Sequence, residues 1–260
     1  MIRSKQTLFL ISSAALFFAG IILLSYRRYD WGLLALLGLL ILYPATKKNH
    51  SVISLFLFFL LGLLLFQFAN GWIGEWDVSK ETKILLNRSF LLLILMGLAV
   101  SHLVSKEKIV LFTQFPNWKR RVSMPSHTIS LPLFLLIGLA GSSTIFIPLI
   151  WSSGISELKA QFLFAIGFTI LNATLEELIW RGVMLSSLKR NVSVLYAVTV
   201  TSLGFGLLHL SIGIPLLLSL LFSFGGLFYA IVVLKTESIY PSIAFHMVMN
   251  FGMVLNGWIN

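Results

Sequence analysis

The sequence contains no cysteine among its 260 residues. This absence excludes disulfide bonds, thiolate metal sites and cysteine nucleophiles. Charged residues are also scarce, at 11% of the chain, whereas soluble globular domains carry roughly 25%. Apolar residues make up 58% of the chain, and apolar runs of about 20 residues recur from one end to the other. The composition therefore excludes a sizeable soluble domain and predicts a chain that folds in a lipid bilayer.

The chain contains a series of apolar segments. As helices, each is long enough, or nearly long enough, to cross about 30 Å of hydrocarbon. They lie at about residues 7–26, 31–46, 51–73, 88–104, 129–151, 160–188, 193–210, 212–234 and 240–258. The segment at 31–46 is short and contains Pro44, so eight spans fit nearly as well as nine. We interpret 7–26 as an uncleaved first span, not a signal peptide. The sequence predicts an all-α, polytopic transmembrane helical bundle with eight or nine spans and a buried polar catalytic cavity.

The basic residues indicate topology. The 19 Lys and Arg give a net charge of +10, but they stand in short clusters between apolar segments and form no single stripe, so no nucleic-acid partner is expected. They are typical of topology signals and of contacts with lipid headgroups. If all nine spans cross with the N-terminus inside, twelve basic residues fall in inner loops and six outside. The inner ones are Arg3, Lys5, Lys47, Lys48, Lys106, Lys108, Lys119, Arg120, Arg121, Lys189, Arg190 and Lys235. The outer ones are Arg27, Arg28, Lys80, Lys83, Arg88 and Lys159. This bias predicts a cytoplasmic N-terminus.

A polar stretch at about 105–128 divides the chain. It mixes Trp118 with basic residues, a combination suited to lying along a headgroup surface. We expect an amino-terminal transmembrane segment, 1–128, with about four spans and no recognised motif, followed by a core at 129–260. Apart from His102, the ionisable residues deep in predicted spans all follow Thr128, so the function is expected in the second part.

Two adjacent carboxylates are the main anomaly of the second part. Glu176 and Glu177 lie inside an apolar span, where each charge costs about 2.5 to 3.5 kcal/mol. Arg181 follows Glu177 at i+4, which favours an ion pair on one helix face. Glu176 lies about 100° around the helix, on the stripe with Asn172 and Trp180, and is free to face something else. Structural contacts between helices are the plain alternative, but a third, unpaired charge argues against it.

Two histidines and an asparagine lie in later spans. His209 ends one span, and His246 and Asn250 are one turn apart in the last, so both of these side chains share a face. A lone histidine in an apolar span is usually a helix contact. Buried polar groups in lipid must find partners, however, and here the available partners are one another. We therefore expect Glu176, His209, His246 and Asn250 to converge.

Such a group supports two kinds of chemistry. A carboxylate in apolar surroundings can take a proton from water, an imidazole can relay it, and a second imidazole and an amide can stabilise an oxyanion. Alternatively Glu176, His209 and His246 can hold a metal, since two His and one Glu are a catalytic Zn²⁺ set. The residues leave this choice open. His-Glu-x-x-His, Gly-x-Ser-x-Gly and phosphate-binding Gly loops are absent.

Three short motifs in this order resemble a known family. They are Glu176-Glu177-x-x-x-Arg181, Phe205-x-x-x-His209 and His246-x-x-x-Asn250, together with Gly225, Gly226, Tyr229 and the turn 235–242. The pattern is similar to the CPBP intramembrane proteases, also called the CAAX protease and bacteriocin-processing family, over about residues 160–258. Each motif alone is weak, whereas their order and membrane context together are fairly specific.

The resemblance implies an intramembrane endopeptidase, of metalloprotease or glutamate type. Glu176 would be the water-activating base with His209 beside it, while His246 and Asn250 would bind the oxyanion or, in the metal view, a cation. Glu177, Arg181 and Phe205 would support them.

The positions of these residues raise a geometric difficulty. On straight helices Glu176 lies near mid-membrane, whereas His209 ends its span on the outer side and His246 lies about two turns from the inner end of its own. These side chains would not meet, so Gly213 and Pro215 predict a break or a tilt after His209.

Two other functions remain open: a transporter or proton-relay protein, and a non-catalytic bacteriocin-immunity or scaffold protein. The expected partners are membrane lipids and a peptide or protein substrate. A compact Leu-rich chain without organelle signals suggests a multi-pass protein of a bacterial cell membrane, which favours a bacteriocin or signalling-peptide precursor as substrate.

Overall fold

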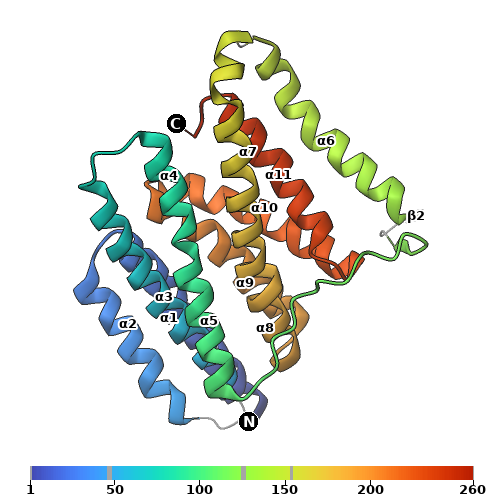
Figure 1. The fold of residues 1–260 in the computed structure, drawn as a ribbon. Coiled ribbons are helices and arrows are strands. Elements are labelled where there is room, and N and C mark those ends of the chain that lie inside the picture. Colours follow the sequence, from blue (N-terminus) through green and yellow to red (C-terminus); the bar gives the residue numbers. More distant parts are fainter. Residues whose placement is uncertain (1, 46–48, 124–126, 153–154, 260) are drawn as a thin grey trace.

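The computed structural model describes residues 2–45, 49–123, 127–152 and 155–259 (Figure 1). Lys47 and Lys48, two of the charges assigned to inner loops, lie outside these ranges. In chain order the helices are α1 (Ile2–Ser25), α2 (Tyr29–Leu42), η1 (Tyr43–Ala45), α3 (His50–Gly74), α4 (Lys80–Ser89), α5 (Leu91–Ser105), α6 (Leu131–Ser152), α7 (Ile155–Glu177), η3 (Leu178–Leu185), α8 (Ser186–Asn191), α9 (Val194–Leu208), η4 (His209–Ile212), α10 (Leu216–Thr236) and α11 (Tyr240–Leu255). η1 and η4 are 3₁₀ turns, and η3 is a π-helix.

The protein is an all-α, multi-pass membrane protein, as predicted. Helical stretches long and apolar enough to cross a membrane are Gln6–Ser25, His50–Gly74, Lys80–Ser105, Gln161–Asn191, Val194–Ile212 and Leu216–Thr236. Two shorter apolar helices, Tyr29–Leu42 and Leu131–Thr144, accompany them, and α11 has 16 residues. Within the described residues, six stretches, not eight or nine, therefore meet the length and composition of a full span. The two ends of the chain lie at opposite ends of the molecule (Figure 1).

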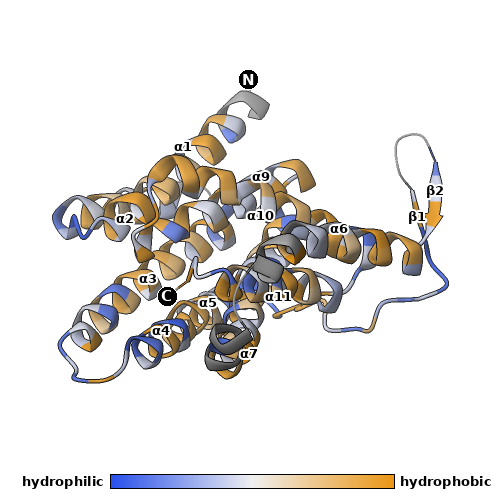
Figure 2. Ribbon diagram, turned by 90° about the horizontal axis from the view of Figure 1, so that it is seen from above, coloured by the Kyte–Doolittle hydropathy of each residue, from blue (hydrophilic) through white to orange (hydrophobic). Residues whose placement is uncertain are grey.

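Most helices consist mainly of hydrophobic residues, whereas α4 has many hydrophilic ones (Figure 2). Ser79 begins α4 as an N-cap, because its hydroxyl accepts a hydrogen bond from the Thr82 amide at 3.2 Å. The polar segment between α5 and α6 ends in an antiparallel ribbon of β1 (Arg121–Ser123) and β2 (Thr128–Ser130). Phe115 and Trp118 in this segment are exposed, and the Phe115 ring stacks on Tyr240. That the segment lies along a headgroup surface stays a prediction.

Glycines allow two helix pairs to approach closely. A Cβ at Gly97 of α5 would lie 2.3 Å from the Phe58 carbonyl oxygen of α3. A Cβ at Gly226 of α10 would lie 2.8 Å from the Ser202 carbonyl oxygen of α9. Small residues bring membrane helices into backbone contact in this way. The second pair matters for the site, because Gly226 also presents its carbonyl to it.

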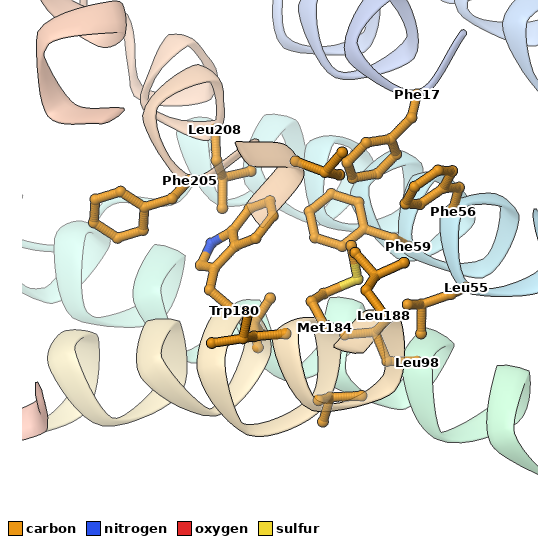
Figure 3. Close-up of a cluster of buried hydrophobic side chains, with 14 of the residues drawn as sticks. Phe17, Leu55, Phe56, Phe59, Leu98, Trp180, Met184, Leu188, Phe205 and Leu208 are labelled. Atoms are coloured by element: carbon orange, nitrogen blue, oxygen red, sulfur yellow. The ribbon is translucent and has the colours of Figure 1, made fainter. Parts of the chain in front are cut away.

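A hydrophobic cluster joins the amino-terminal helices to the later ones (Figure 3). The ring of Phe17 in α1 stacks on Phe56 of α3, with centroids 4.4 Å apart. Phe59 of α3 packs against Trp180 of η3 at 5.0 Å. The two parts of the chain thus share one apolar core, and Trp180 belongs to it.

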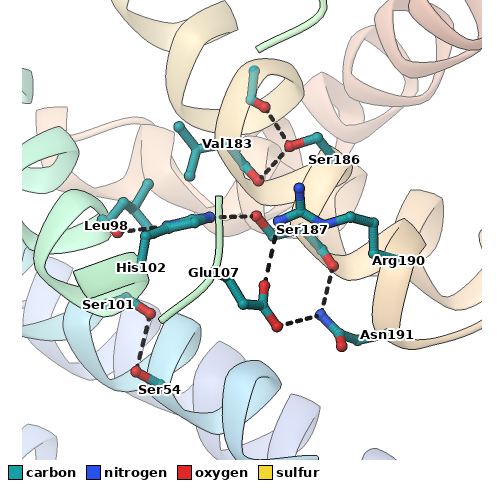
Figure 4. Close-up of polar contacts among 11 residues, drawn as sticks. Ser54, Leu98, Ser101, His102, Glu107, Val183, Ser186, Ser187, Arg190 and Asn191 are labelled. Carbon is teal, nitrogen blue, oxygen red and sulfur yellow. Dashed lines mark hydrogen bonds and ion pairs between the residues drawn. The ribbon is translucent and has the colours of Figure 1, made fainter. Parts of the chain in front are cut away.

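A polar cluster connects α5 with α8 near the end of α5 (Figure 4). Both ring nitrogens of His102 are engaged: Nδ1 donates to the Leu98 carbonyl at 2.9 Å, and Nε2 accepts from the Ser187 hydroxyl at 2.8 Å. Nearby, Glu107 accepts from Arg190 and Asn191, both at 3.2 Å. We call these residues the α5–α8 cluster.

Candidate active site

The adjacent glutamates lie where a regular α-helix gives way to a wider helical turn. α7 ends at Glu177, and the same rod continues as the π-helix η3, which contains Arg181, into α8. π-turns are rare and are frequent at functional sites. The helix therefore changes from α to π directly after Glu176 and Glu177, and Arg181 lies within the π-helix.

Glu177 is fully buried and its oxygens are fully engaged. Arg181 donates from Nη1 to Oε1 at 2.7 Å, and His246 donates from Nδ1 to the same oxygen at 3.0 Å. The hydroxyl of Ser242 donates to Oε2. The predicted pair of Glu177 and Arg181 is present, and Glu177 also orients His246. Sequence reasoning did not single out Ser242 or this second role of Glu177.

Arg181 connects Glu177 to α9 and α10. Its Nη2 donates to the Gly226 carbonyl at 2.9 Å, and its guanidinium lies 4.5 Å from the ring centre of Phe205 and 5.1 Å from that of Tyr229. Such cation–π contacts favour a buried guanidinium. Phe205 supports the charged pair through this contact.

Glu176 is 3% exposed and faces two cationic or polar groups. Its Oε1 lies 3.5 Å from Nη1 of Arg88, and its Oε2 lies 3.6 Å from Nε2 of His246. Within the described residues Oε2 has no hydrogen-bond partner. The expectation that Glu176 is unpaired is therefore wrong, because Arg88 of α4 stands beside it.

Arg88 is the main site residue that the sequence analysis misplaced. The predicted span began at Arg88 and left it among the outer charges, whereas the helical stretch begins at Lys80. Arg88 therefore lies inside that stretch, with 8% of its surface exposed. The sequence analysis expected His102 to be the one ionisable residue deep in a span of the first part of the chain. That expectation is wrong, because Arg88 is another. The low hydropathy of α4 obscured the signal.

His246 and Asn250 project from one face of α11, as predicted. The His246 ring stacks on Tyr229, with centroids 4.9 Å apart, and its Nδ1–H bond to Glu177 directs Nε2 toward Glu176. Nδ2 of Asn250 is buried and has no hydrogen-bond partner within the described part of the chain. α11 therefore presents an oriented imidazole and an available amide.

His209 is held differently. It begins the 3₁₀ turn η4, its Nδ1 donates to the Phe205 carbonyl at 2.9 Å, and its ring stacks on Phe222 at 4.3 Å. Among the described residues, the imidazole found within ion-pair distance of Glu176 is that of His246. The resemblance implied that His209 stands beside Glu176, and the structure brings His246 closer.

Glu176, His209, His246 and Asn250 nevertheless line one cavity of about 690 Å³. The predicted break after His209 is present: α9 ends at Leu208, the chain tightens into η4, and Gly213 adopts φ = 89°. This turn lets His209 meet a cavity formed by α7, α10 and α11. Asn172, one turn before Glu176, also lines the cavity, and its Oδ1 is buried without a partner in the described residues.

The fit to a metal ion is poor in this arrangement. Within the described residues no three His, Asp or Glu side chains lie close enough together to hold one. The Arg88 guanidinium also occupies the side of Glu176 opposite His246. The set Glu176, His209 and His246, which the sequence offers for Zn²⁺, does not form a metal site as these side chains lie.

A comparison with known families gives a match to the later part of the chain. Residues 158–252 match the family model described as type II CAAX prenyl endopeptidase Rce1-like. The match covers α7 to α11 and includes each motif residue named above, so the resemblance found in the sequence is confirmed over this range. No curated protein and no solved structure matches the chain.

Proposed function

We propose, from the match of residues 158–252 to a type II CAAX prenyl endopeptidase model, that this protein is an intramembrane endopeptidase. It hydrolyses a peptide bond of a peptide or protein substrate that reaches the cavity from or beside the bilayer. The observation that carries the proposal is the position of His246, whose two ring nitrogens face Glu177 and Glu176 at the wall of the cavity.

In the proposed mechanism Glu176 and His246 activate water together. Because Nδ1 of His246 donates to Glu177, we assign its Nε2, which faces Glu176, as the acceptor for water. A water on the cavity side that contacts both Nε2 and Oε2 of Glu176 loses its proton to Glu176 as it attacks the scissile carbonyl. Glu177 acts as the orienting carboxylate, in the manner of the third member of a hydrolytic triad.

The oxyanion that forms on the scissile carbonyl needs donors. Nδ2 of Asn250 is buried, lines the cavity and is not used by another described residue, so we assign it this role. His209 already donates from Nδ1 to Phe205, which leaves its Nε2 side for substrate. Glu176 then returns its proton to the leaving amine, and the peptide bond is broken.

Glu176→Gln tests the proposal, because it keeps the shape of the side chain and removes the base. We expect turnover of fluorescence-quenched apolar peptides by the purified protein in lipid nanodiscs to fall about 10²- to 10⁴-fold. Glu107→Gln in the α5–α8 cluster is the matched control and should keep full turnover. Equal turnover in wild type and Glu176→Gln contradicts the proposal.

The same variant separates the alternatives. A proton-relay protein would lose proton flux in vesicles while showing no peptide cleavage in either form. A scaffold protein would keep its role with Gln at position 176. Either result overturns the proposed hydrolysis.

Water activation by Glu176 and His246 predicts that a strong chelator leaves turnover of the purified protein unchanged. The Zn²⁺ hypothesis predicts loss of turnover on chelation and recovery when Zn²⁺ is added back. The metal content of the same samples, measured before and after chelation, shows whether any change in turnover accompanies the loss of a bound metal.

For the setting, we propose a bacterial cell membrane with the N-terminus in the cytoplasm. The substrate that fits this setting is a bacteriocin or signalling-peptide precursor. Proteolysis of a tag at the N-terminus in intact cells and in inverted vesicles tests the orientation, since protection should occur only in intact cells.

A further inference from the structure

The wall of the cavity formed by α4 is cationic, although α4 lies outside the range that matches the protease family. Lys80, Lys83, Asn87 and Arg88 all line the cavity, and the spacing i, i+3, i+7, i+8 places them on one helix face. This α4 wall runs about 12 Å along the helix, from Lys80 to Arg88 at Glu176. Figures 1 and 2 show α4 as a hydrophilic helix at the end of the molecule where the C-terminus lies.

Exposure along this wall decreases toward the catalytic residues. Lys80 is exposed, Lys83 is half-buried, and Asn87 and Arg88 are each 8% exposed. Nε of Arg88 is buried without a hydrogen-bond partner in the described residues. The α4 wall therefore begins at the surface and ends at Arg88, which still has a buried donor available for a ligand.

The charges of the cavity are strongly unbalanced. Among the described residues that line it, Glu176 is the one carboxylate, whereas α4 contributes three cations, of which Arg88 lies beside Glu176. Another part of the lining, here called the apolar wall, is formed by residues of η4, the following turn and α10, namely Ile212, Ile214, Leu218, Leu221 and Phe222. A cleft with cations on one wall and apolar side chains on the other favours an amphipathic ligand that is negative on one side.

We propose that the α4 wall binds a carboxylate of the peptide substrate, either an acidic side chain or a free C-terminal carboxylate, while the apolar wall holds its apolar residues. The inference rests on the proposed peptidase function and names the substrate class: apolar peptides with negative charge beside the cleavage site. Lys80 and Lys83 draw the charged group in, and Arg88 limits how far it advances toward Glu176.

Anionic lipid headgroups are the competing occupant of surface lysines. The position of Arg88 favours a peptide, because a buried guanidinium beside Glu176 lies beyond the reach of a headgroup that stays in the bilayer surface. The apolar wall runs inward beside it, where a peptide chain with both kinds of side chain fits.

The test compares matched peptides on the full chain in nanodiscs. Quenched peptides share one Leu-rich centre and carry two Asp or two Asn on either flank, with a free or amidated C-terminus. We expect wild type to cleave carboxylate-bearing peptides with a kcat/KM about three- to ten-fold higher, a difference that salt reduces. Lys80→Gln with Lys83→Gln should abolish this preference, and Lys80→Glu should shift it toward peptides flanked by Lys.

Lys108→Gln, at an exposed loop cation that follows α5 and does not line the cavity, is the control and should keep the preference. Lys83 also donates to the Gly74 carbonyl at 3.0 Å, so its replacement in the double variant can disturb the turn between α3 and α4. Lys80→Glu keeps this hydrogen bond and therefore tests the charge alone. Equal cleavage of charged and neutral peptides overturns the inference and leaves the proposed function intact. A third outcome is that turnover depends on the anionic lipid content of the nanodisc but not on peptide charge, and that this dependence is lost in the double variant. That outcome overturns the inference and assigns the α4 wall to lipid headgroups.

Binding of the same labelled peptides to Glu176→Gln gives a readout that needs no turnover. Charge-selective binding without cleavage by wild type contradicts the proposed function and supports the α4 wall. Binding without charge selectivity contradicts the α4 wall whatever the turnover.

Discussion

Two polar regions of this protein differ in how completely their groups are paired. In the α5–α8 cluster both nitrogens of His102 have partners, and Glu107 accepts two hydrogen bonds. At the cavity, Oε2 of Glu176, Nδ2 of Asn250 and Oδ1 of Asn172 have none among the described residues. A buried polar group without a partner is costly, and those that line the cavity are placed where a substrate or water can bind them. Pairing, and not burial, therefore separates these two polar regions.

The largest expected contrast is between the two buried histidines. His246→Ala removes the imidazole that faces Glu176, so the turnover of folded protein should fall about 10²- to 10⁴-fold. His102→Ala should leave turnover per folded molecule nearly unchanged and lower the free energy of unfolding by about 1–3 kcal/mol, because Ser187 and the Leu98 carbonyl lose their partner. Peptide cleavage and thermal unfolding of both variants check the contrast, and a similar loss of turnover in both would contradict it.

The two paired carboxylates give the next contrast, in stability. Glu177→Gln leaves Arg181 buried without a counter-charge, so we expect a loss of about 3–5 kcal/mol, together with loss of turnover because His246 is no longer held. Glu107→Gln affects a partly exposed ion pair and should cost about 0–1 kcal/mol. Denaturant titration in detergent measures both. Equal effects would mean that Glu177 has no greater structural role than Glu107.

Helix contact gives the smallest contrast. Gly226→Ala forces α10 away from Ser202 of α9 and should cost about 1–3 kcal/mol while it moves the carbonyl that binds Arg181. Gly141→Ala in α6 meets no described atom within 4 Å and should change stability by less than about 1 kcal/mol, in the stabilising direction. Unfolding midpoints of the two variants decide whether this close approach matters.

The helices themselves were predictable from the sequence. A bilayer requires each backbone group to be paired within its segment, so long apolar runs become helices whatever surrounds them. Their ends were less predictable where polar residues extend a helix. α4 is the clearest case, because its Lys, Glu and Asn residues hid eight helical residues before Arg88.

The stripe of Asn172, Glu176 and Trp180 shows a second limit. A regular α-helix places all three on one face, but the π-helix begins at Leu178. Asn172 and Glu176 line the cavity, whereas Trp180 packs against Phe59 in the apolar core (Figure 3). For this stripe the α-helical spacing held only up to Glu176, whereas the i,i+4 pair of Glu177 and Arg181 formed across the same boundary.

By itself, the sequence determined the all-α membrane class and the pairing of Glu177 with Arg181, because these depend on composition and on spacing within one helix. It also singled out the residues to which we assign the chemistry. Only the tertiary structure decided which histidine stands against Glu176, that Glu177 orients it, and that Arg88 from the first part of the chain joins the site. Those contacts join residues far apart in the chain. Their distances depend on how α4, α7 and α11 pack, on the turn at η4 and on the π-helix, and local spacing carries no information about them.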